Sequence, residues 1–335
     1  MKMISHISLY LLISWAQVSP IFAQQLPYFY LFQDVPTQVN PASLPLDMIS
    51  DDDNAHRIVV QNRTQWLGLG FDQLPQTSSL EYDYFFKTSD QIDWMNGSHI
   101  VYDRNGRFSQ LGLYGRTSAQ FVLSQNNLSG PRLSIGISSG LVNYRLNVQD
   151  ARVASGGSTP LTGFSDWKAD FGFGVYYIHP LPWSRWKRSN KIYIGLSVPQ
   201  TLGRKLSLEN SSVDKDLEFS YSRYRHYYAN LGGSIRMGYS GNFKIEPSIW
   251  FKYVPKVPMH VDLTCRFTVI DKYRFGVGYS TSKMASVSGG LRLNPKSANG
   301  RAGRKVYYVN YGFGYQMGAL QSLGTSHELA LIFHW

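Results

Sequence analysis

One short stretch of the sequence has the residue types and spacing of a hydrolase nucleophile. Residues Gly136–Gly140 read G-I-S-S-G, matching the G-x-S-x-G string in which a strand-to-helix turn exposes the serine hydroxyl. In this chain the string lies inside residues 131–146, where apolar and polar residues alternate as in a continuous strand. Because the required turn is not predicted there, we expect Ser138 to be structural, and we predict no catalytic residue and no enzyme activity.

The spacing of the possible metal ligands does not support a metal site. No two histidines have the H-E-x-x-H arrangement of a zinc protease, and the single cysteine, Cys265, excludes both a cysteine-based zinc site and an internal disulfide. Residues Asp51–Asp53 resemble the start of a calcium loop, but the glycine and the distal glutamate of such a loop are missing. We therefore predict no metal ion and no cofactor. The histidines are His6, His56, His99, His179, His226, His260, His327 and His334.

The basic balance of the chain raises the question of nucleic acid binding. Lys and Arg number 33 against 22 Asp and Glu, which gives a formal net charge of +11. Residues Trp183–Arg188 combine tryptophan with basic side chains, a composition found where proteins stack on nucleic acids and also at membrane–water interfaces. Since the N-terminus predicts export, we favour the membrane interface and expect no nucleic acid partner.

Residues 1–23 are predicted to form a secretory signal peptide. Lys2 supplies the positive start, residues 7–13 are mostly apolar, and Ala23 is a small residue suited to cleavage. No later stretch offers the roughly 20 apolar residues of a transmembrane helix. We therefore expect the protein to act outside the cytoplasm after cleavage near Ala23.

Side-chain type alternates with a period of two through nearly the whole remaining chain. Charged residues make up only 16% of the sequence, and the 30 Gly and 23 Tyr are poor helix formers. In residues 305–316, for example, aromatic residues and valine share one face, while Asn310, Gly312 and Gly314 share the other. An apolar, aromatic face over about ten residues, opposed by a small, polar or charged face, is the pattern of a transmembrane β-barrel.

Counting the alternating segments predicts an all-β, antiparallel transmembrane barrel of about fourteen strands. With both ends of the barrel in the periplasm, the longest connections, 147–167 and 200–225, fall on the extracellular side, where bacterial barrels carry their long loops. Tight turns are predicted at Asn105-Gly106, Ser240-Gly241 and Asp271-Lys272. The predicted strands are 57–69, 77–86, 98–104, 107–123, 131–146, 168–178, 190–199, 226–239, 242–253, 259–270, 272–282, 285–294, 304–316 and 326–335.

The last ten residues alternate up to Trp335. Leu329, Leu331, Phe333 and Trp335 share one face. A final strand that ends on an in-phase aromatic residue resembles the signal by which outer-membrane barrels are recognised for insertion. We therefore expect the protein in the outer membrane of a Gram-negative bacterium, in contact with outer-membrane lipid.

The face opposite to the lipid carries a set of charged residues. A charged side chain that faces lipid near the midplane costs a few kcal/mol, so we expect these residues to point into the lumen. Such a set is compatible with an anion-preferring pore, with internal pairing or with a bound plug, and the sequence leaves the three open. Its members are Arg116, Asp170, Arg236, Lys244, Glu246, Lys252, Asp262, Arg266, Arg274, Arg292 and Glu328.

Residues 24–55 precede the first strand and are predicted to form an irregular, plug-like segment, followed by the barrel at 56–335 without a second domain. Prolines at positions 27, 36, 41 and 45 exclude a strand within the sheet. The backbone groups of this segment need partners, which the hydrocarbon region lacks. We expect the segment in the lumen or at its periplasmic mouth, held by charges such as Arg236, Arg266 and Glu328.

A series of short motifs runs from the signal peptide to the last strand. They are an aromatic stretch and N-P-A (Tyr28–Tyr30 and Asn40–Ala42), Q-W-x-G and P-x-T (Gln65–Gly68 and Pro75–Thr77), D-F-G-x-G-x-Y-Y (Asp170–Tyr177), Y-x-G-L-S (Tyr193–Ser197), E-P-S (Glu246–Ser248) and S-H-E-x-x-L (Ser326–Leu331). In their order and spacing, these motifs resemble the PorP/SprF membrane proteins of the type IX secretion system over most of the mature chain. The usual G-F-D-G-A-P-x-T of that family is replaced by Leu69–Thr77, which leaves the conformation of the first hairpin open.

The resemblance implies a non-catalytic outer-membrane component of type IX secretion and gliding motility. Its expected partners are the C-terminal domain of a large secreted or surface protein, such as a gliding adhesin, and periplasmic or outer-membrane components of the machinery. Two other interpretations stay open: a barrel that transports solutes or lipids, and an outer-membrane hydrolase, for which the sequence offers no credible catalytic set. A lumen filled by residues 24–50 favours export or anchorage, whereas an open basic channel favours transport.

Overall fold

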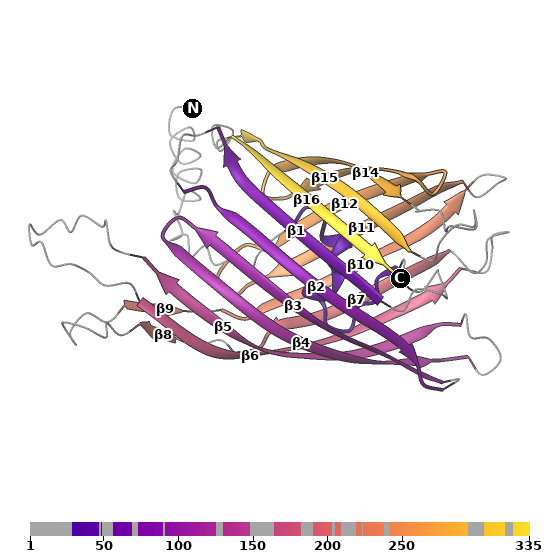
Figure 1. Ribbon diagram of the computed structural model, residues 1–335, viewed down its shortest axis with the longest axis horizontal. Coiled ribbons are helices and arrows are strands. Elements are labelled where there is room, and N and C mark those ends of the chain that lie inside the picture. The colour runs from indigo at the N-terminus through magenta and orange to yellow at the C-terminus, as the bar shows by residue number, and fades with distance from the viewer. Residues whose placement is uncertain are drawn as a thin grey trace, which may run out of the picture.

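A computed structural model of the chain forms a closed β-barrel around a short irregular segment (Figure 1). The irregular segment contains one turn of 3-10 helix, η1 (Phe32–Asp34), and one of α-helix, α2 (Pro36–Val39). In the part of the chain that the structure describes, no helix is long and apolar enough to cross a membrane. The described residues are 29–46, 48, 56–68, 73–89, 91–124, 130–147, 164–181, 190–202, 205–208, 219–222, 224–237, 242–293, 305–318 and 324–335.

Fourteen antiparallel strands close the barrel, and β1 pairs with β16 at the seam. Each other strand pairs with its neighbours along the chain, except that β7 pairs directly with β10. The strands of the barrel are β1 (His56–Leu67), β2 (Gln76–Lys87), β3 (Ile92–Asn105), β4 (Phe108–Val122), β5 (Arg132–Leu146), β6 (Phe164–Pro180), β7 (Lys191–Gln200), β10 (His226–Met237), β11 (Phe243–Tyr253), β12 (His260–Val269), β13 (Tyr273–Ser280), β14 (Met284–Leu293), β15 (Val306–Gln316) and β16 (Thr325–His334).

The predicted barrel is confirmed, and most of its strand boundaries agree with the structure to within two residues. The largest error is at β3, which begins at Ile92 instead of residue 98. Its first half reverses the expected polarity, because the apolar Met95 is fully buried inside the barrel while the polar Asn96 faces outward. Strand β6 begins at Phe164 instead of residue 168, because its pairing with β5 continues to Leu146.

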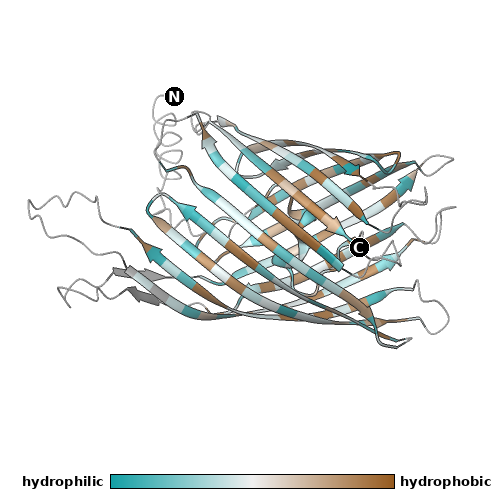
Figure 2. Ribbon diagram, viewed as in Figure 1, coloured by the Kyte–Doolittle hydropathy of each residue, from teal (hydrophilic) through white to brown (hydrophobic). Residues whose placement is uncertain are grey.

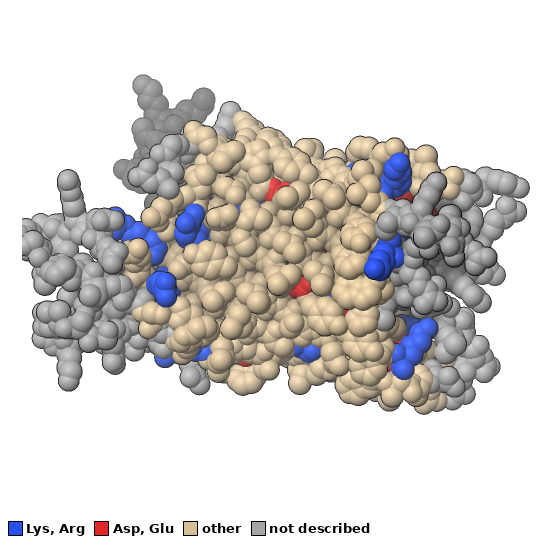
Figure 3. Space-filling view, viewed as in Figure 1, with Lys and Arg blue, Asp and Glu red and all other residues tan. Residues whose placement is uncertain are grey.

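Successive side chains of each strand point alternately outward and inward. The outward side chains are mostly apolar, and the inward ones pack in the lumen or form ion pairs there. On β7, Ile194 and Leu196 are 50% and 59% exposed, whereas Tyr193 and Ser197 are buried. Figure 2 shows the same alternation of apolar and polar residues along the strands. In Figure 3, most of the visible Lys and Arg side chains lie near the two ends of the barrel, and the surface between them is mainly uncharged. This outward apolar band is the surface that a bilayer requires.

The connection between β7 and β10 contains a second, small sheet that the sequence analysis did not predict. Strands β8 (Lys205–Leu208) and β9 (Phe219–Ser222) pair only with each other. They lie at the end of the barrel opposite to the C-terminus (Figure 1), which we call the outer end. We assign this end to the cell exterior, because bacterial barrels carry their longer connections there. The signal peptide predicted at 1–23, Asp51–Asp53 and Trp183–Arg188 lie outside the described residues.

Cys265 provides a direct test of the lipid-facing surface. It lies in β12 on the same face as Leu263, which is 46% exposed, and it pairs across the sheet with Pro247 and Val277. We expect a membrane-permeant maleimide to label Cys265 in the folded barrel, and a bulky, water-soluble maleimide to leave it unlabelled. Rapid labelling by the water-soluble reagent would place the thiol in the lumen and reverse the orientation of β12.

Candidate functional site

The centre of the barrel is occupied by residues 29–46 and 48, which we call the lumen segment. Its prolines prevent it from joining the sheet, and Pro36 instead starts α2, where a missing N–H costs no hydrogen bond. Phe29, Val35 and Leu44 are almost completely buried between the lumen segment and the wall. The prediction that this part of the chain lies in the lumen is therefore confirmed for the described residues.

The first anchor of the lumen segment is a carboxylate from the last strand. Glu328 is buried, and its oxygens accept hydrogen bonds from the backbone N–H groups of Tyr30 (2.7 Å) and Leu31 (2.9 Å). Gln61 donates to the same carboxylate. On the neighbouring strand, Arg63 donates to the Tyr30 hydroxyl at 3.0 Å and stacks over its ring, with Cζ 4.3 Å from the centroid. The barrel seam between β1 and β16 thus holds the start of the lumen segment.

The second anchor is Asp34, which joins strands on both sides of the lumen. Its carboxylate accepts hydrogen bonds from Arg266 Nη1 on β12 and Asn310 Nδ2 on β15, both at 2.7 Å. Its backbone carbonyl accepts a hydrogen bond from Arg57 on β1. Arg266 is itself oriented by Glu246, since its Nε lies 2.9 Å from Glu246 Oε2. Hydrogen bonds between charged groups are about twice as strong as neutral ones, so the pair of Asp34 with Arg266 makes this a strong anchor of the lumen segment.

The third anchor is Asn40, the asparagine of the N-P-A motif. Its Nδ2 donates to the carbonyl oxygens of Val175 on β6 (3.1 Å) and Leu196 on β7 (3.3 Å). Its Oδ1 accepts from the N–H of Ala42 at 2.9 Å and so fixes the local turn. A Cβ atom at Gly174 would overlap Asn40 Oδ1. Because Gly174 has no side chain, the Asn40 side chain can lie directly against the backbone of the barrel wall.

The G-I-S-S-G string has a related structural role. It lies within β5, as predicted, and its strand continues to Leu146. A Cβ atom at Gly136 would lie 2.5 Å from the backbone of Pro41 and Ala42, so only glycine allows the lumen segment to pack so closely. Ser138 is buried and faces the lumen.

The inward charges predicted from alternation pair with each other, with aromatic rings or with the lumen segment. For Arg236, one of the residues expected to hold the N-terminal segment, Nη1 pairs with Asp271 Oδ2 at 2.9 Å near the turn after β12. Alternation alone does not show how far along the barrel a side chain lies. The partners of the other inward charges include Asp83 for Arg116, Tyr114 for Asp170, Glu246 for Lys244, Asp262 for Lys252, and the ring of Tyr308 for Arg274 and Arg292.

The sequence analysis missed a second group of inward charges on the first strands. Arg57 Nη1 lies 2.8 Å from Glu81 Oε1 and 3.0 Å from Asp83 Oδ2, and Asp83 also pairs with Arg116. Asp93 and Arg132 form another buried pair at 2.7 Å. Alternation with Ile58 and Val60 already places Arg57 inward, so the same signal was sufficient to identify it. Among the described residues, no group of His, Cys, Asp and Glu side chains is arranged to hold a metal ion.

Comparison with known proteins identifies one family by sequence and one fold by structure. The sequence model of the family described as "Type IX secretion system membrane protein PorP/SprF" matches residues 21–333. No curated protein sequence matches this chain. Among solved structures, a "CymD monoaromatic hydrocarbon channel" is 12% identical, with a TM-score of 0.52 over 90% of this chain and 91% of that chain. A FadL homologue from Pseudomonas aeruginosa is 10% identical, with a TM-score of 0.50 over 88% and 91%. At such identities the structural likeness shows the outer-membrane barrel fold alone.

Proposed function

The chain belongs to the PorP/SprF family of type IX secretion system membrane proteins, and we propose that it serves the export or surface anchoring of large secreted proteins. It is an outer-membrane β-barrel. Gliding adhesins are one class of cargo that this role would include. The partners we propose are the C-terminal domain of the cargo and periplasmic or outer-membrane components of the secretion and motility machinery. We assign the protein no catalytic step.

The observation that carries this proposal is the filled lumen. Glu328, Asp34 and Asn40 tie the lumen segment to strands on opposite sides of the barrel. A lumen built for solute flow is polar and water-filled, whereas here prolines, aromatic rings and paired charges occupy the space. A barrel closed in this way supports a role as a docking scaffold in the outer membrane.

The outer end of the barrel is the surface that we assign to cargo. The β8–β9 sheet extends the connection between β7 and β10 at this end (Figure 1). Loops held by a rigid scaffold are the usual carriers of binding function. In addition, the strand edges of a two-stranded sheet can pair with an extended segment of another protein.

Removal of this sheet tests the proposal. In cells whose only copy of the protein has residues 203–223 replaced by a short Gly-Ser linker, we expect cargo to disappear from the cell surface. The measurement is protease accessibility of the cargo on intact cells. The control replaces residues 254–259, a short connection at the same end, and is expected to retain display. Normal display with the 203–223 replacement, at normal barrel levels, would contradict the proposal.

Transport of small solutes or lipids is the second candidate function. It is favoured by a cavity lined by uncharged residues between the N-terminal segment and the wall, and by the fold shared with the CymD monoaromatic hydrocarbon channel. Steady, large conductance from the unmodified protein, together with normal cargo display after the 203–223 replacement, would favour transport over export.

A further inference from the structure

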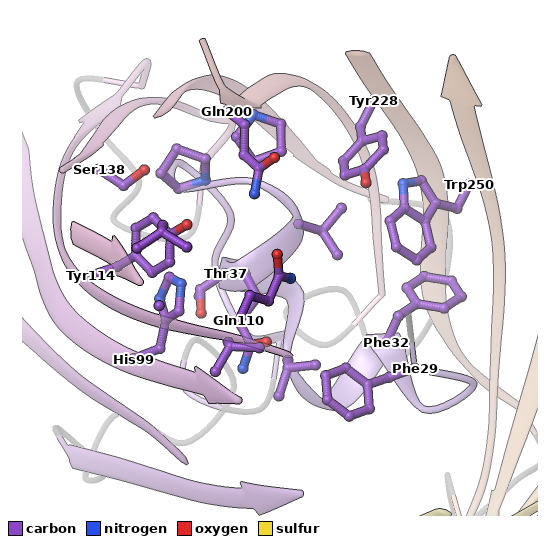
Figure 4. A pocket seen from close by; sticks show the side chains of 18 residues that line it. Phe29, Phe32, Thr37, His99, Gln110, Tyr114, Ser138, Gln200, Tyr228 and Trp250 are labelled. Carbon is purple, nitrogen blue, oxygen red and sulfur yellow. The ribbon is translucent and has the colours of Figure 1, made fainter. Parts of the chain in front are cut away.

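A cavity with about 800 Å³ of empty space, open solvent included, lies between the lumen segment and the wall (Figure 4). We call it the outer bowl, because its wall residues include Gln110 near the start of β4, Gln200 at the end of β7 and Tyr228 near the start of β10. These positions lie at the outer end, next to the β8–β9 connection. The lumen segment forms the opposite wall through residues of η1, α2 and their flanks.

The outer bowl differs from the rest of the lumen in charge. None of the 18 described residues that line it is Asp, Glu, Lys or Arg. Elsewhere in the lumen, paired charges such as Arg266 and Glu246 fill the space between the lumen segment and the wall. Burying a charged ligand without an opposite charge costs several kcal/mol. The bowl therefore suits an uncharged ligand.

One side of the outer bowl is aromatic. The ring centroids of Phe32 and Trp250 lie 4.9 Å apart, and Tyr228 meets Trp250 edge-on at 5.1 Å. Figure 4 shows these three side chains together on one side of the cavity, with His99 and Tyr114 on the other. A further aromatic ring can pack favourably against such a cluster in an offset-stacked or edge-to-face arrangement. This side of the bowl suits a ring.

Three residues that line the same cavity carry polar atoms without hydrogen-bond partners. Thr37 Oγ1, Gln38 Nε2 and His99 Nδ1 are buried and have no partner among the described residues. Thr37 and His99 are 2% and 8% exposed. A buried polar group that lacks a partner costs about 1–3 kcal/mol. A ligand with both donors and acceptors can supply the partners that these three groups lack.

We propose that the outer bowl binds an uncharged aromatic amide. The ring packs against Phe32, Tyr228 and Trp250, while the amide accepts a hydrogen bond from Gln38 Nε2 and exchanges further ones with Thr37 and His99. The same chemistry is present in an aromatic residue of an extended peptide and in a free aromatic solute. This inference does not depend on the proposed function, since the bowl can bind such a group whether or not the protein exports cargo.

The test uses N-acetylphenylalaninamide as the probe and the full barrel in a nonionic detergent. Saturation-transfer NMR gives its dissociation constant, with empty micelles as the blank. We expect N-acetylphenylalanine, which replaces the amide by a carboxylate, to bind about tenfold more weakly or not at all. Toluene, which lacks hydrogen-bonding groups, is also expected to bind more weakly. Equal affinities for the three probes, or no binding of the amide, would overturn the proposal.

A variant of the lumen segment locates the site. Thr37→Val removes the buried hydroxyl with little change of shape, and because this hydroxyl has no partner in the barrel, the variant is expected to fold normally. We expect it to weaken binding of the amide roughly fivefold, as for the loss of one hydrogen bond. The control, Thr117→Val, removes a hydroxyl that bonds Asn96 on the outward face, and its affinity is expected to stay unchanged. Equal affinity of Thr37→Val and the unmodified protein would place the amide elsewhere.

A peptide distinguishes the two sources of the ligand. The acetylated and amidated peptide Gly-Phe-Ser-Gly presents the same amide within an extended chain. Binding at least about tenfold tighter than the single-residue amide would assign the bowl to a peptide segment, since added contacts raise affinity by this factor for each 1.4 kcal/mol. Equal or weaker binding would assign it to a small solute. If the 203–223 replacement loses cargo display but binds the amide with unchanged affinity, the result supports both the proposed role in export and the amide site, and shows that they are separate.

Discussion

Deletion of residues 29–42 should turn a poorly conducting barrel into an open channel and raise its conductance in planar bilayers about tenfold or more, since the lumen of a larger barrel exceeds what its own side chains fill. The deleted stretch contains Asp34 and Asn40, and also Tyr30 and Leu31, whose N–H groups bond Glu328. The wall strands keep their ladder hydrogen bonds, and the exposed charges of Glu328 and Arg266 become hydrated. The barrel is therefore expected to stay folded.

Two controls separate opening of the lumen from general disruption of the protein. Replacement of residues 203–223 changes the connection between β7 and β10 and leaves the lumen segment intact, so its conductance is expected to equal that of the unmodified protein. Asp34→Ala keeps the full chain but removes the pairs with Arg266 and Asn310, so we expect short, intermittent openings. A high and steady conductance of the unmodified protein, equal to that of the deletion, would contradict the closed lumen.

The barrel could be predicted from the sequence because each of its strands repeats one local signal. An outward aromatic or aliphatic residue at every second position is required wherever a strand crosses lipid, and this signal survives errors at single residues. It failed over Ile92–Gly97, where inward Met95 packs in the cluster that contains Leu44 and Met48 of the lumen segment. That part of the wall is shaped by its contact with the lumen segment, which the pattern of β3 alone does not contain.

The lumen segment could be located in advance, but most of its partners could not. Prolines and aromatic residues indicate a buried segment that cannot join the sheet, whereas the pairing of Asp34 with Arg266 depends on how far along the barrel the two residues lie. The wall glycines carried more information than the sequence analysis used. Gly136 and Gly174 lie on the lumenal face at positions where a side chain would strike the lumen segment. Glycine on an inward face therefore indicates close approach of a second backbone.

Substitution Asp83→Asn is expected to cost about 3–5 kcal/mol of unfolding free energy, the loss seen when one partner of a buried ion pair is removed. The Asp83 side chain is completely buried and pairs with Arg57 at 3.0 Å and with Arg116. The amide removes the charge with almost no change in shape. Arg57 keeps its ion pair with Glu81, but Arg116 loses its ion pair with the carboxylate at position 83. The measurement is reversible urea unfolding of the barrel in lipid vesicles.

The matched control for this loss is Asp271→Asn, which breaks the ion pair with Arg236 at the rim of the same barrel. Arg236 and Asp271 have 23% and 41% of their side chains exposed, and exposed pairs contribute about 0–1 kcal/mol. In the double variant Asp83→Asn with Arg116→Met, we expect part of the stability to return, because the unpaired buried guanidinium is then gone. Equal, small losses in Asp83→Asn and Asp271→Asn would mean that water reaches Asp83, and that the wall charges near the lumen segment are solvated instead of sealed.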